Sequence, residues 1–325
     1  MWTDVIKLIE THEHFLIATH VHPDGDAIGT QVALGLLLNE LGKATLLVNE
    51  DPVPPIYRFL DPNGRLRTYD PARDDTDIGA CDAAFVVDVG ALDRIGKVGQ
   101  ALERHAVPIA CIDHHATNNG FADIDVVVTT AASSASLVLD LIRAMGRAPT
   151  PRVAEALYVG VATDTGWFRF PNAQPQAFRD AAALTDHGAD PSRVYELIYE
   201  NLSWPRTRLL AHTLNTLKAE ADGRIAYVAI TLAMFEQAGA RLDEVEGFVD
   251  KLRELGGTEI LILFRERPEG GTRVSLRAKH DLDVGSLAAR FGGGGHRRAA
   301  GITLDAPLEA AVPTILTAAR ELLDS

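Results

Sequence analysis

Residues 15–26, with the sequence FLIATHVHPDGD, join a short apolar run to a group of acidic and imidazole side chains. The run over residues 15–19 is apolar without alternation, which is typical of a strand buried on both faces of a parallel sheet. A helical pattern follows from about residue 27 to residue 41 and stops at Gly42. This order of strand, loop and helix predicts the first unit of an α/β fold.

The same alternation continues through the first half of the chain. Further apolar runs predict strands, and amphipathic stretches predict helices, which together give a mostly parallel sheet with flanking helices. The turn-forming sequence HGADP over residues 187–191 predicts the end of this first domain, residues 1–190. The predicted strands are residues 44–48, 83–87 and 108–112, and the predicted helices are residues 134–145 and 151–162.

The second half predicts a smaller α/β domain over residues 222–325. A helical connecting arm or hinge, interrupted at Trp204-Pro205, is expected to precede it over residues 191–221. A chain of 325 residues is also longer than one hydrophobic core usually serves. We therefore expect two domains, with the active site in the cleft between them. The strands of the second domain are predicted at residues 225–230, 259–264 and 272–277, and its helices at residues 242–255, from residue 284, and at residues 308–323.

The charge balance limits the partners of the protein. Lys and Arg total 31 against 45 Asp and Glu, a net charge of -14. Because binding to a long phosphate backbone depends on cations, this balance argues against long duplex nucleic acid. It leaves open a short anionic substrate held by local cations or metal ions.

The sequence also predicts where the protein works. No run is long and apolar enough to span a membrane, and the first residues lack the pattern of a signal peptide. Cys81 and Cys111 lie in apolar runs and are read as buried free thiols. We therefore expect a cytoplasmic location and no membrane partner.

Acidic and imidazole side chains follow the predicted strands and one predicted helix. In an open α/β sheet the carboxyl ends of the strands form the edge where ligands bind. Separate segments of the chain therefore deliver carboxylates and imidazoles to one edge. The residues are His20, Asp24 and Asp26 after the first strand, Asp88 after the third, Asp113, His114 and His115 after the fourth, and Asp164 at the end of the helix from Pro151.

Each of these groups alone has an ordinary structural explanation. An Asp-Gly-Asp sequence is usually a turn or a helix cap, and a histidine after a strand is usually structural. Together, however, so many acidic groups would repel one another and raise some pKa values unless cations compensated. Mixed imidazole and carboxylate ligands favour Mn²⁺, Co²⁺, Fe²⁺ or Zn²⁺ over Ca²⁺. The number of ligands suits two ions, a type of site that hydrolyses phosphate esters by means of a bridging hydroxide.

These motifs resemble the DHH phosphoesterase superfamily. The resemblance rests on the spacing His20-x-x-x-Asp24-x-Asp26, on Asp88, on the triplet at residues 113–115 and on Asp164. The sequences RVSLR at residues 273–277 and GGGGH at residues 292–296 resemble the DHH-associated C-terminal domain, DHHA1. The whole chain is covered, and it is most similar to the compact branch of nanoRNases and pAp phosphatases.

The resemblance implies a role for each residue of the metal motif. One ion would be held by His20, Asp24 and Asp88, and the other by Asp26, Asp88, His114 and Asp164, so that Asp88 bridges them. His115 would face the phosphate as a general acid or phosphate ligand, and Asp113 would orient the histidines. The implied cofactors are two divalent ions, Mn²⁺ first, with Co²⁺, Mg²⁺, Fe²⁺ and Zn²⁺ left open. Because members of this branch often dimerise, a homodimer is also implied.

The second half predicts a substrate clamp. Glycine lets a backbone approach a ligand closely, and backbone N–H groups can cradle an anion. Alternate residues of a strand share a face, and guanidinium groups suit phosphates and bases. A flexible linker and a solvated strand face are the structural alternatives. The residues assigned to substrate binding are Arg273, Ser275, Arg277, Gly293, Gly294, Gly295 and His296.

The expected reaction is hydrolysis of short oligonucleotides, such as the dinucleotide pApA, to mononucleotides, and of pAp to AMP. A phosphodiesterase for cyclic dinucleotides such as cyclic di-AMP is the alternative substrate assignment, and a non-catalytic nucleotide sensor is the alternative of another class. A family II pyrophosphatase and a RecJ-like exonuclease fit less well, because the substrate motif of the former and the basic track of the latter are lacking. Relatives commonly have other residues at Ala116, Ala173 and Ala278, and the last change leaves the choice of substrate open.

Overall fold

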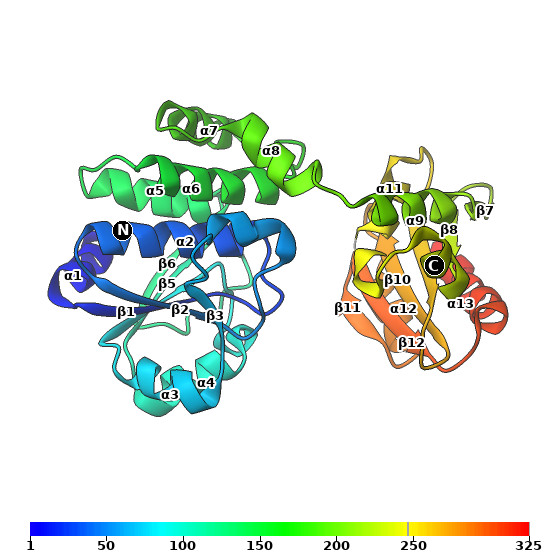
Figure 1. Cartoon of the computed structure of the whole chain (residues 1–325), viewed down its shortest axis with the longest axis horizontal. Coiled ribbons are helices and arrows are strands. Elements are labelled where there is room, and N and C mark those ends of the chain that lie inside the picture. The colour runs from blue at the N-terminus through cyan, green and yellow to red at the C-terminus, as the bar shows by residue number, and fades with distance from the viewer. Residues whose placement is uncertain (246, 325) are drawn as a thin grey trace. The chain divides into compact units, whose positions relative to one another are not determined.

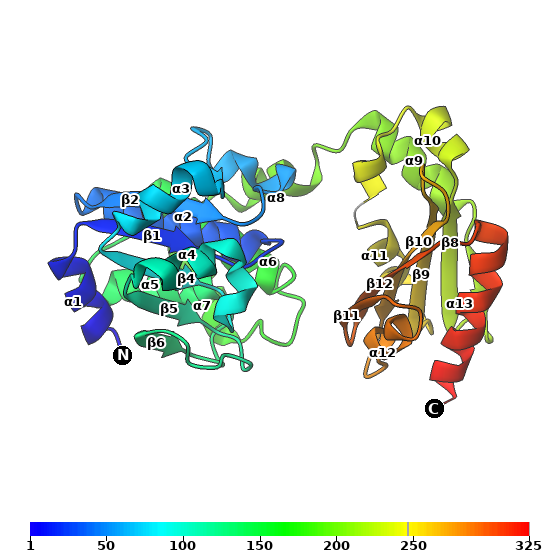
Figure 2. The same cartoon turned by 90° about the horizontal axis from the view of Figure 1, so that it is seen from below.

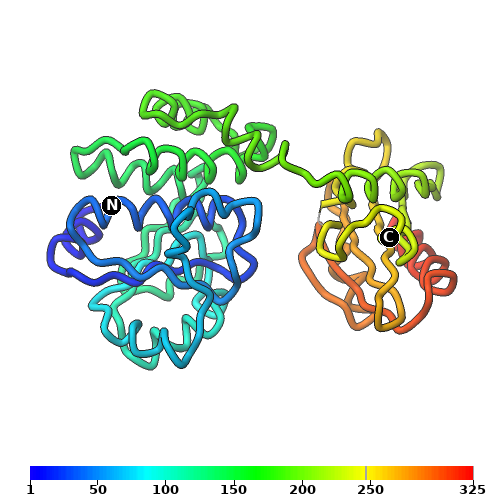
Figure 3. Tube along the Cα trace, in the orientation of Figure 1, coloured from blue at the N-terminus to red at the C-terminus, as the bar shows by residue number. Residues whose placement is uncertain are grey.

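The computed structural model describes residues 1–245 and 247–324. The chain forms two compact units, residues 1–201 and residues 202–325 (Figure 1). The backbone trace in Figure 3 passes from one unit to the next through the non-helical residues 200–203. The boundary divides the segment that we expected to be an arm: α8 (Pro191–Tyr199) lies in the first unit and α9 (Trp204–Leu214) in the second. The helical break therefore precedes Trp204, because Ser203 caps α9 and Pro205 suits its first turn.

The first unit is built on a parallel sheet with the strand order β3-β2-β1-β4-β5-β6. Neighbouring strands are parallel throughout. The order reverses between β1 and β4, and such a reversal opens a crevice at the carboxyl ends of the two strands. The strands are β1 (His14–Ala18), β2 (Ala44–Asn49), β3 (Leu66–Thr68), β4 (Ala83–Val87), β5 (Ile109–Asp113) and β6 (Ile124–Val127).

Helices cover both faces of this sheet (Figures 1 and 2). Phe15 and Ile17 of β1 belong to the hydrophobic cluster shared with α1, α2, α5, α6, α7 and α8. Leu16 and Ala18, which point the opposite way, pack in a second cluster with α3 and α4. Strands buried on both faces explain the uninterrupted apolar runs of the sequence. The other helices are α1 (Thr3–Thr11), α2 (Gly25–Glu40), α3 (Pro71–Gly79), α4 (Lys97–His105), α5 (Ser134–Ala144), α6 (Pro151–Asp164) and α7 (Pro175–Asp186), with 3-10 turns η1 (Pro55–Leu60) and η2 (Leu92–Ile95).

Helices α2 and α6 pack with unusually close backbones. A Cβ atom on Gly29 would lie 2.4 Å from the carbonyl oxygen of Ala156. A Cβ atom on Gly160 would lie 2.5 Å from Cβ of Ala135 and 2.6 Å from Oδ1 of Asp26. Glycine at these positions therefore lets the first turn of α2 approach the last turns of α6.

The second unit is built on a mixed sheet with the order β11-β12-β10-β9-β8-β7, in which only β8 and β9 are parallel. Helices α12 and α13 cover one face, and α9, α10 and α11 cover the other. The strands are β7 (Lys218–Glu220), β8 (Ile225–Ile230), β9 (Ile260–Glu266), β10 (Thr272–Ala278), β11 (Gly294–His296) and β12 (Ala299–Leu304). The helices are α10 (Leu232–Ala238), α11 (Phe248–Lys251), α12 (Val284–Ala289) and α13 (Leu308–Leu323), with 3-10 turns η3 (Leu242–Val245) and η4 (Leu252–Glu254).

Two local expectations differ from the structure. The single helix expected at residues 242–255 is wrong, because the described residues of this stretch form η3, α11 and η4. Gly247 adopts a left-handed conformation with φ of 78° and separates η3 from α11. The glycine-rich run is also more regular than a loop, since Gly294–His296 forms an edge strand paired with β12.

Among the described residues, no helix combines the length and the apolar character that crossing a lipid bilayer would require.

Candidate metal centre

The structure brings all six predicted metal ligands of the first unit together. His20 follows β1, Asp24 caps α2 and Asp26 lies in its first turn, Asp88 follows β4, His114 follows β5 and Asp164 ends α6. The ligand atoms fall into groups whose members lie within 4.8 Å of one another: His20 with Asp24 and Asp88, Asp26 with His114 and Asp164, and Asp88 with His114 and His115. The carboxyl edge of the sheet is therefore the site, as its strand order predicts.

Asp88 occupies the middle of this cluster. Its Oδ2 lies 3.6 Å from Nε2 of His20, and its Oδ1 lies 3.5 Å from Nε2 of His114. Each carboxylate oxygen thus faces a different group of ligands. One group is completed by Asp24, whose Oδ1 is 4.0 Å from His20 Nε2. The other is completed by Asp164 and Asp26, whose Oδ2 atoms are 3.8 Å and 4.0 Å from His114 Nε2.

This donor set fits two divalent ions. Ligand atoms bound at about 2.1 Å to one ion lie roughly 3 to 3.5 Å apart, only slightly closer than the atoms here. The set contains imidazole nitrogens and carboxylate oxygens, which suits ions such as Mn²⁺, Fe²⁺, Co²⁺ and Zn²⁺. Bound ions would act as Lewis acids that activate a water molecule and stabilise charge on a phosphoryl group.

The electrostatics of the cluster require cations. Burial, together with the neighbouring charge of Asp88, raises the pKa of Asp26 well above its usual range. Burial likewise raises the pKa of Asp164 to about 6. At His114 burial opposes protonation, but the surrounding Asp88, Asp26 and Asp164 outweigh it and raise the pKa to about 9. A proton on His114 therefore neutralises part of the negative charge that divalent ions would otherwise neutralise.

The pKa of Asp88 moves the other way. Burial alone would raise it, but the hydrogen bonds to His114 and His20 outweigh burial and lower it. The central carboxylate therefore stays ionised, as a ligand shared by two ions must.

The N-terminus of α5 holds two of these carboxylates, which sequence reasoning missed. Asp26 accepts hydrogen bonds from the backbone N–H groups of Ser134 and Ala135, at 2.7 Å and 3.0 Å, and from the Thr30 hydroxyl at 3.0 Å. The hydroxyl of Ser134 donates to Asp88 Oδ1 at 2.9 Å. In the sequence, Ser134 reads only as the beginning of a helix, so nothing there connects it to Asp88.

Asn172 holds Asp164 in place and was also missed. Its Nδ2 donates to Asp164 Oδ2 at 2.9 Å and to the carbonyl oxygen of Ala132 at 2.9 Å. The bond fixes the carboxylate oxygen that faces His114. Asn172 follows Asp164 by eight residues in an irregular turn, where no periodicity could reveal the pairing.

The two remaining residues of the triplet, Asp113 and His115, form a pair. The fully buried Asp113 accepts a bond from His115 Nδ1 at 2.7 Å and from Asn118 Nδ2 at 2.8 Å. This bond raises the pKa of His115, whose side chain is 45% exposed. Asp113 therefore orients the His115 ring through Nδ1.

The backbone at Asp88 is itself unusual, with φ of 60°. A positive φ is uncommon outside glycine and is found most readily in Asn and Asp among the other residues. Strained conformations of this kind cluster at functional sites, where the surroundings enforce them. Here the N–H of Asp88 is fixed by the carbonyl oxygen of Ile112 at 2.9 Å.

The predicted clamp residues lie in the second unit. Arg273, Ser275 and Arg277 alternate with buried residues and share one face of β10. Arg277 Nε lies 3.1 Å from Asp250 Oδ1, and Arg273 Nη1 donates to Thr303 Oγ1 at 2.8 Å. His296 is exposed on the edge strand β11.

The three predicted clamp glycines differ in their surroundings. Gly293 and Gly295 lie against β12, so that a Cβ atom there would be 2.3 Å and 2.5 Å from the carbonyl oxygens of Gly301 and Ala299. Gly294 has open space around it.

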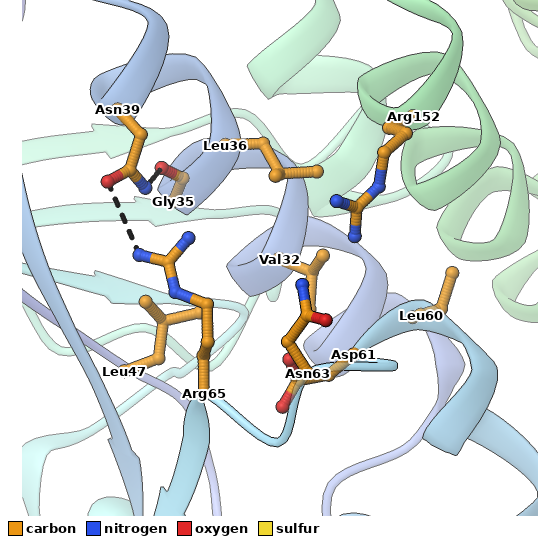
Figure 4. A pocket seen from close by; sticks show the side chains of 10 residues that line it. All are labelled: Val32, Gly35, Leu36, Asn39, Leu47, Leu60, Asp61, Asn63, Arg65 and Arg152. Carbon is orange, nitrogen blue, oxygen red and sulfur yellow. Dashed lines mark hydrogen bonds between the residues drawn. The ribbon is translucent and has the colours of Figure 1, made fainter. Parts of the chain in front are cut away.

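A small pocket in the first unit is distinct from the metal centre (Figure 4). Its cavity volume of about 30 Å³ holds roughly one water molecule. It lies near the last turn of α2, where Asn39 and Arg65 are hydrogen bonded, whereas Asp24 and Asp26 lie at the first turn. The lining residues on α2 run from Val32 to Asn39, and none of the six proposed metal ligands lines this pocket. The lining residues are Val32, Gly35, Leu36, Asn39, Leu47, Leu60, Asp61, Asn63, Arg65 and Arg152.

Both units of the chain match known family models. Residues 14–161 match the family model described as "DHH family, N-terminal domain", and residues 222–325 match the "DHHA1 domain". The bifunctional oligoribonuclease and PAP phosphatase NrnA of Thermus thermophilus is 34% identical, over 98% of this chain and 93% of that protein. The protein of the same name from Bacillus subtilis is 26% identical, over 94% of this chain and 93% of its own.

Solved structures show the same fold. An exopolyphosphatase-related protein from Bacteroides fragilis superposes with a TM-score of 0.90 at 27% identity, covering 98% of this chain and 95% of that one. RecJ from Thermus thermophilus shares the fold, with a TM-score of 0.54 at 16% identity, over 97% of this chain and 53% of that one. The matches and the acidic–imidazole cluster lead to one conclusion: the chain belongs to the DHH family, carries a DHHA1 domain, and is a metal-dependent phosphoesterase.

Proposed function

We propose that the protein hydrolyses short oligonucleotides, such as the dinucleotide pApA, to mononucleotides, and pAp to AMP. The observation that carries the proposal is the position of Asp88, whose two oxygens face two separate groups of ligands. Support for the substrate class comes from relatives named as oligoribonuclease and PAP phosphatase. The net charge of -14 also favours short substrates, because a long phosphate chain would be repelled.

The proposed ligand sets are His20, Asp24 and Asp88 for one ion, and Asp26, Asp88, His114 and Asp164 for the other. Mn²⁺ is the proposed ion, since imidazole and carboxylate ligands together suit it.

His115 is the proposed proton donor. A water molecule releases one proton to solvent, and the hydroxide oxygen forms a bond to phosphorus while the bond to the leaving ribose oxygen breaks; the leaving oxygen takes a proton from His115 Nε2. Asp113 raises the pKa of His115 and holds the ring, which favours the protonated form that a proton donor needs.

The proposed clamp for the nucleotide consists of Arg273, Ser275, Arg277, Gly293, Gly294, Gly295 and His296. Arg277 would exchange its bond with Asp250 for a phosphate or a base. An Arg277→Ala change should raise KM for pApA by roughly tenfold or more but leave the rate on a generic phosphoester nearly unchanged. Equal losses on both substrates would count against this assignment.

Two further properties belong to this proposal. We propose a homodimer, to be checked by sedimentation, and a reducing cytoplasmic location. Both cysteines are free, and burial raises the pKa of Cys81 to about 11, which keeps it as an unreactive thiol.

The test compares the rates on pApA, pAp, cyclic di-AMP and a longer RNA at one fixed Mn²⁺ concentration. We expect pApA and pAp to be cleaved faster than the other two. An Asp88→Asn variant should lose at least 100-fold of this activity, whereas Asp51→Asn, which changes a carboxylate outside the cluster, should retain it. A strong preference for the longer RNA or for cyclic di-AMP would overturn the substrate assignment, and activity that survives in Asp88→Asn would overturn the metal centre.

A further inference from the structure

Residues 165–172 form a tight turn that follows directly after the ligand Asp164. Gly166, Trp167 and Phe168 all have positive φ, of 56°, 57° and 62°. For the two aromatic residues this conformation costs on the order of 1–2 kcal/mol each. The turn therefore persists only because its surroundings enforce it.

Packing of two aromatic side chains anchors the turn. The Trp167 ring packs edge-on against Tyr195 at 4.9 Å, and its Nε1 donates to the Tyr199 hydroxyl at 2.9 Å, both on α8. The Phe168 ring lies 5.1 Å from Phe178 on α7. Trp167 and Phe168 thus attach the turn to two helices, and their rings are partly buried there.

Phe170 in the same turn is exposed. Its backbone N–H is fixed by the carbonyl oxygen of Thr165 at 3.0 Å, yet its side chain is 50% exposed. The ring covers Gly166, where a Cβ atom would lie 2.5 Å from its Cε2 and Cζ atoms. The ring is therefore supported by backbone on one side and open to solvent on another.

The turn that carries Phe170 begins and ends beside the proposed ligand Asp164. Gly166 follows Asp164 by two residues, so their Cα atoms are at most about 7 Å apart. On the other side, Asn172 follows Phe170 by two residues and bonds directly to Asp164 Oδ2 at 2.9 Å. Both connections hold Phe170 near the carboxylate that would bind an ion.

Arg169 adds a positive charge beside this ring. Its guanidinium carbon lies 5.8 Å from the Phe170 ring centroid, and its Nε donates to the carbonyl oxygen of Gly166 at 2.7 Å. In the part of the chain that the structure describes, Arg169 has no ion pair with a carboxylate. Phe170 is half-exposed, and an exposed aromatic ring with an adjacent guanidinium is an arrangement on which proteins stack the bases of single-stranded nucleic acids.

We propose that Phe170 is a stacking platform for one nucleobase of the substrate, with Arg169 beside it, in the first unit. This inference rests on the proposed function and adds a base-binding subsite outside the clamp of the second unit. A platform of this kind accepts any base, because every base has an aromatic face. The protein would then bind both a phosphate and a base with the metal-binding unit alone.

The test combines a change in the protein with a change in the substrate. The substrates are pApA and two analogues in which one or the other adenine is replaced by hydrogen, cleaved by the full chain with Mn²⁺. The variants are Phe170→Ala, Phe170→Leu, which keeps apolar bulk over Gly166, and Phe170→Trp. Trp204→Ala is the control, because Trp204 is an exposed aromatic residue outside this turn, 79% exposed against 50% for Phe170.

We expect Phe170→Ala to raise KM for pApA by roughly 5- to 100-fold, with a smaller change in kcat. This loss should disappear with the analogue that lacks the stacked base, which also identifies that base. Phe170→Leu should show the same dependence on the base, Phe170→Trp should retain the low KM, and Trp204→Ala should behave as the unchanged protein.

Three outcomes overturn the inference. These are an unchanged KM in both Phe170→Ala and Phe170→Leu, a loss that is the same on all three substrates, and a change in oligomeric state accompanied by a loss that does not depend on the base. If the unchanged protein fails to cleave pApA, the proposed function itself fails, and the platform falls with it. Cleavage of pApA without a base-dependent loss overturns the platform alone.

Discussion

Single hydrogen bonds determine how the Asp88 carboxylate is presented. One of its oxygens faces His20, and the other faces His114 while also accepting the Ser134 hydroxyl. A carboxylate oxygen has enough lone pairs to serve an ion and a hydroxyl donor together. Ser134 is therefore a positioning residue for the carboxylate that would be shared by two ions.

A Ser134→Ala change should weaken Mn²⁺ binding by about 10- to 100-fold, as loss of a group that orients a metal ligand typically does. Calorimetric titration with Mn²⁺ measures this. Ser136→Ala, in the same turn of α5 but away from Asp88, is the control and should keep the original affinity. Equal affinities for the two variants would show that the hydroxyl does not position the ligand.

The pKa of His114 predicts how metal binding depends on pH. An ion needs the neutral imidazole, whereas the metal-free site holds a proton on His114 up to about pH 9. Mn²⁺ affinity should therefore rise about tenfold per pH unit between pH 6 and 8, with release of a proton. Titrations in buffers of different ionisation enthalpy measure both effects. His22→Gln, which changes an exposed histidine outside the cluster, should keep the slope, and a flat affinity would contradict the assignment.

The same shift affects the metal-free protein in the opposite direction. Since the pKa of His114 is raised on folding from 6.5 to about 9, its contribution to stability is complete below pH 6.5 and is lost as the pH rises through 9. Thermal unfolding of the metal-free protein should therefore occur at lower temperature at pH 9 than at pH 6.5.

The sequence predicted the residues that the structure brings together as proposed ligands, but not the residues that hold them. His20, Asp88 and His114 could be predicted because each follows a recognisable apolar strand. Ser134 and Asn172 could not, because they contact Asp88 and Asp164 only after α5 and the turn beyond α6 have folded against the sheet. Nothing in the local pattern distinguishes them from an ordinary helix start or a turn residue.

At the scale of elements, the packing of α2 against α6 sets the geometry of the site. Asp24 and Asp26 lie at the start of α2, and Asp164 ends α6. Gly160 is the point where the two helices and α5 approach one another, since its missing side chain leaves room for Ala135 and Asp26.

A Gly160→Ala change should lower the free energy of unfolding by about 1–3 kcal/mol and displace the Asp26 carboxylate, which weakens metal binding. The matched control is Gly35→Ala on α2, whose added Cβ would meet flexible ends of Leu47 at 3.2 Å. Chemical denaturation and Mn²⁺ titration measure the two effects. If both variants are equally stable and bind Mn²⁺ equally well, the close approach at Gly160 has no role in the site.

Central elements were predictable and peripheral ones were not. Strands β1, β2, β4 and β5 are continuous apolar runs because both of their faces are covered. Strands β3 and β6 lie at the edges, where they are short and carry polar residues such as Arg67 and Asp125, so their patterns resemble loops. The helix expected at residues 242–255 fails for a local reason, the left-handed Gly247.

At the scale of the whole molecule, each unit buries its sheet with its own helices. All six proposed metal ligands and the Phe170 platform belong to residues 1–201, whereas the proposed clamp belongs to residues 202–325. Chemistry and part of the substrate recognition are thus assigned to different folding units.

Residues 1–201 produced alone should therefore fold cooperatively and bind Mn²⁺ about as tightly as the full chain, because a unit with its own core can fold independently. Cleavage of pApA should be strongly reduced, since the clamp is absent. Circular dichroism, Mn²⁺ titration and the pApA assay measure these three properties. A fragment that does not fold, or that cleaves pApA as fast as the full chain, would contradict this division of roles.

The left-handed backbone at residue 88 restricts which amino acids can replace Asp88. With φ of 60°, this position favours glycine, asparagine, aspartate and histidine over other residues. Of these four, only aspartate carries two equivalent anionic oxygens, and glutamate would place them one methylene too far from His20 and His114. Aspartate therefore suits both the backbone conformation at position 88 and the proposed role of a carboxylate shared by two ions.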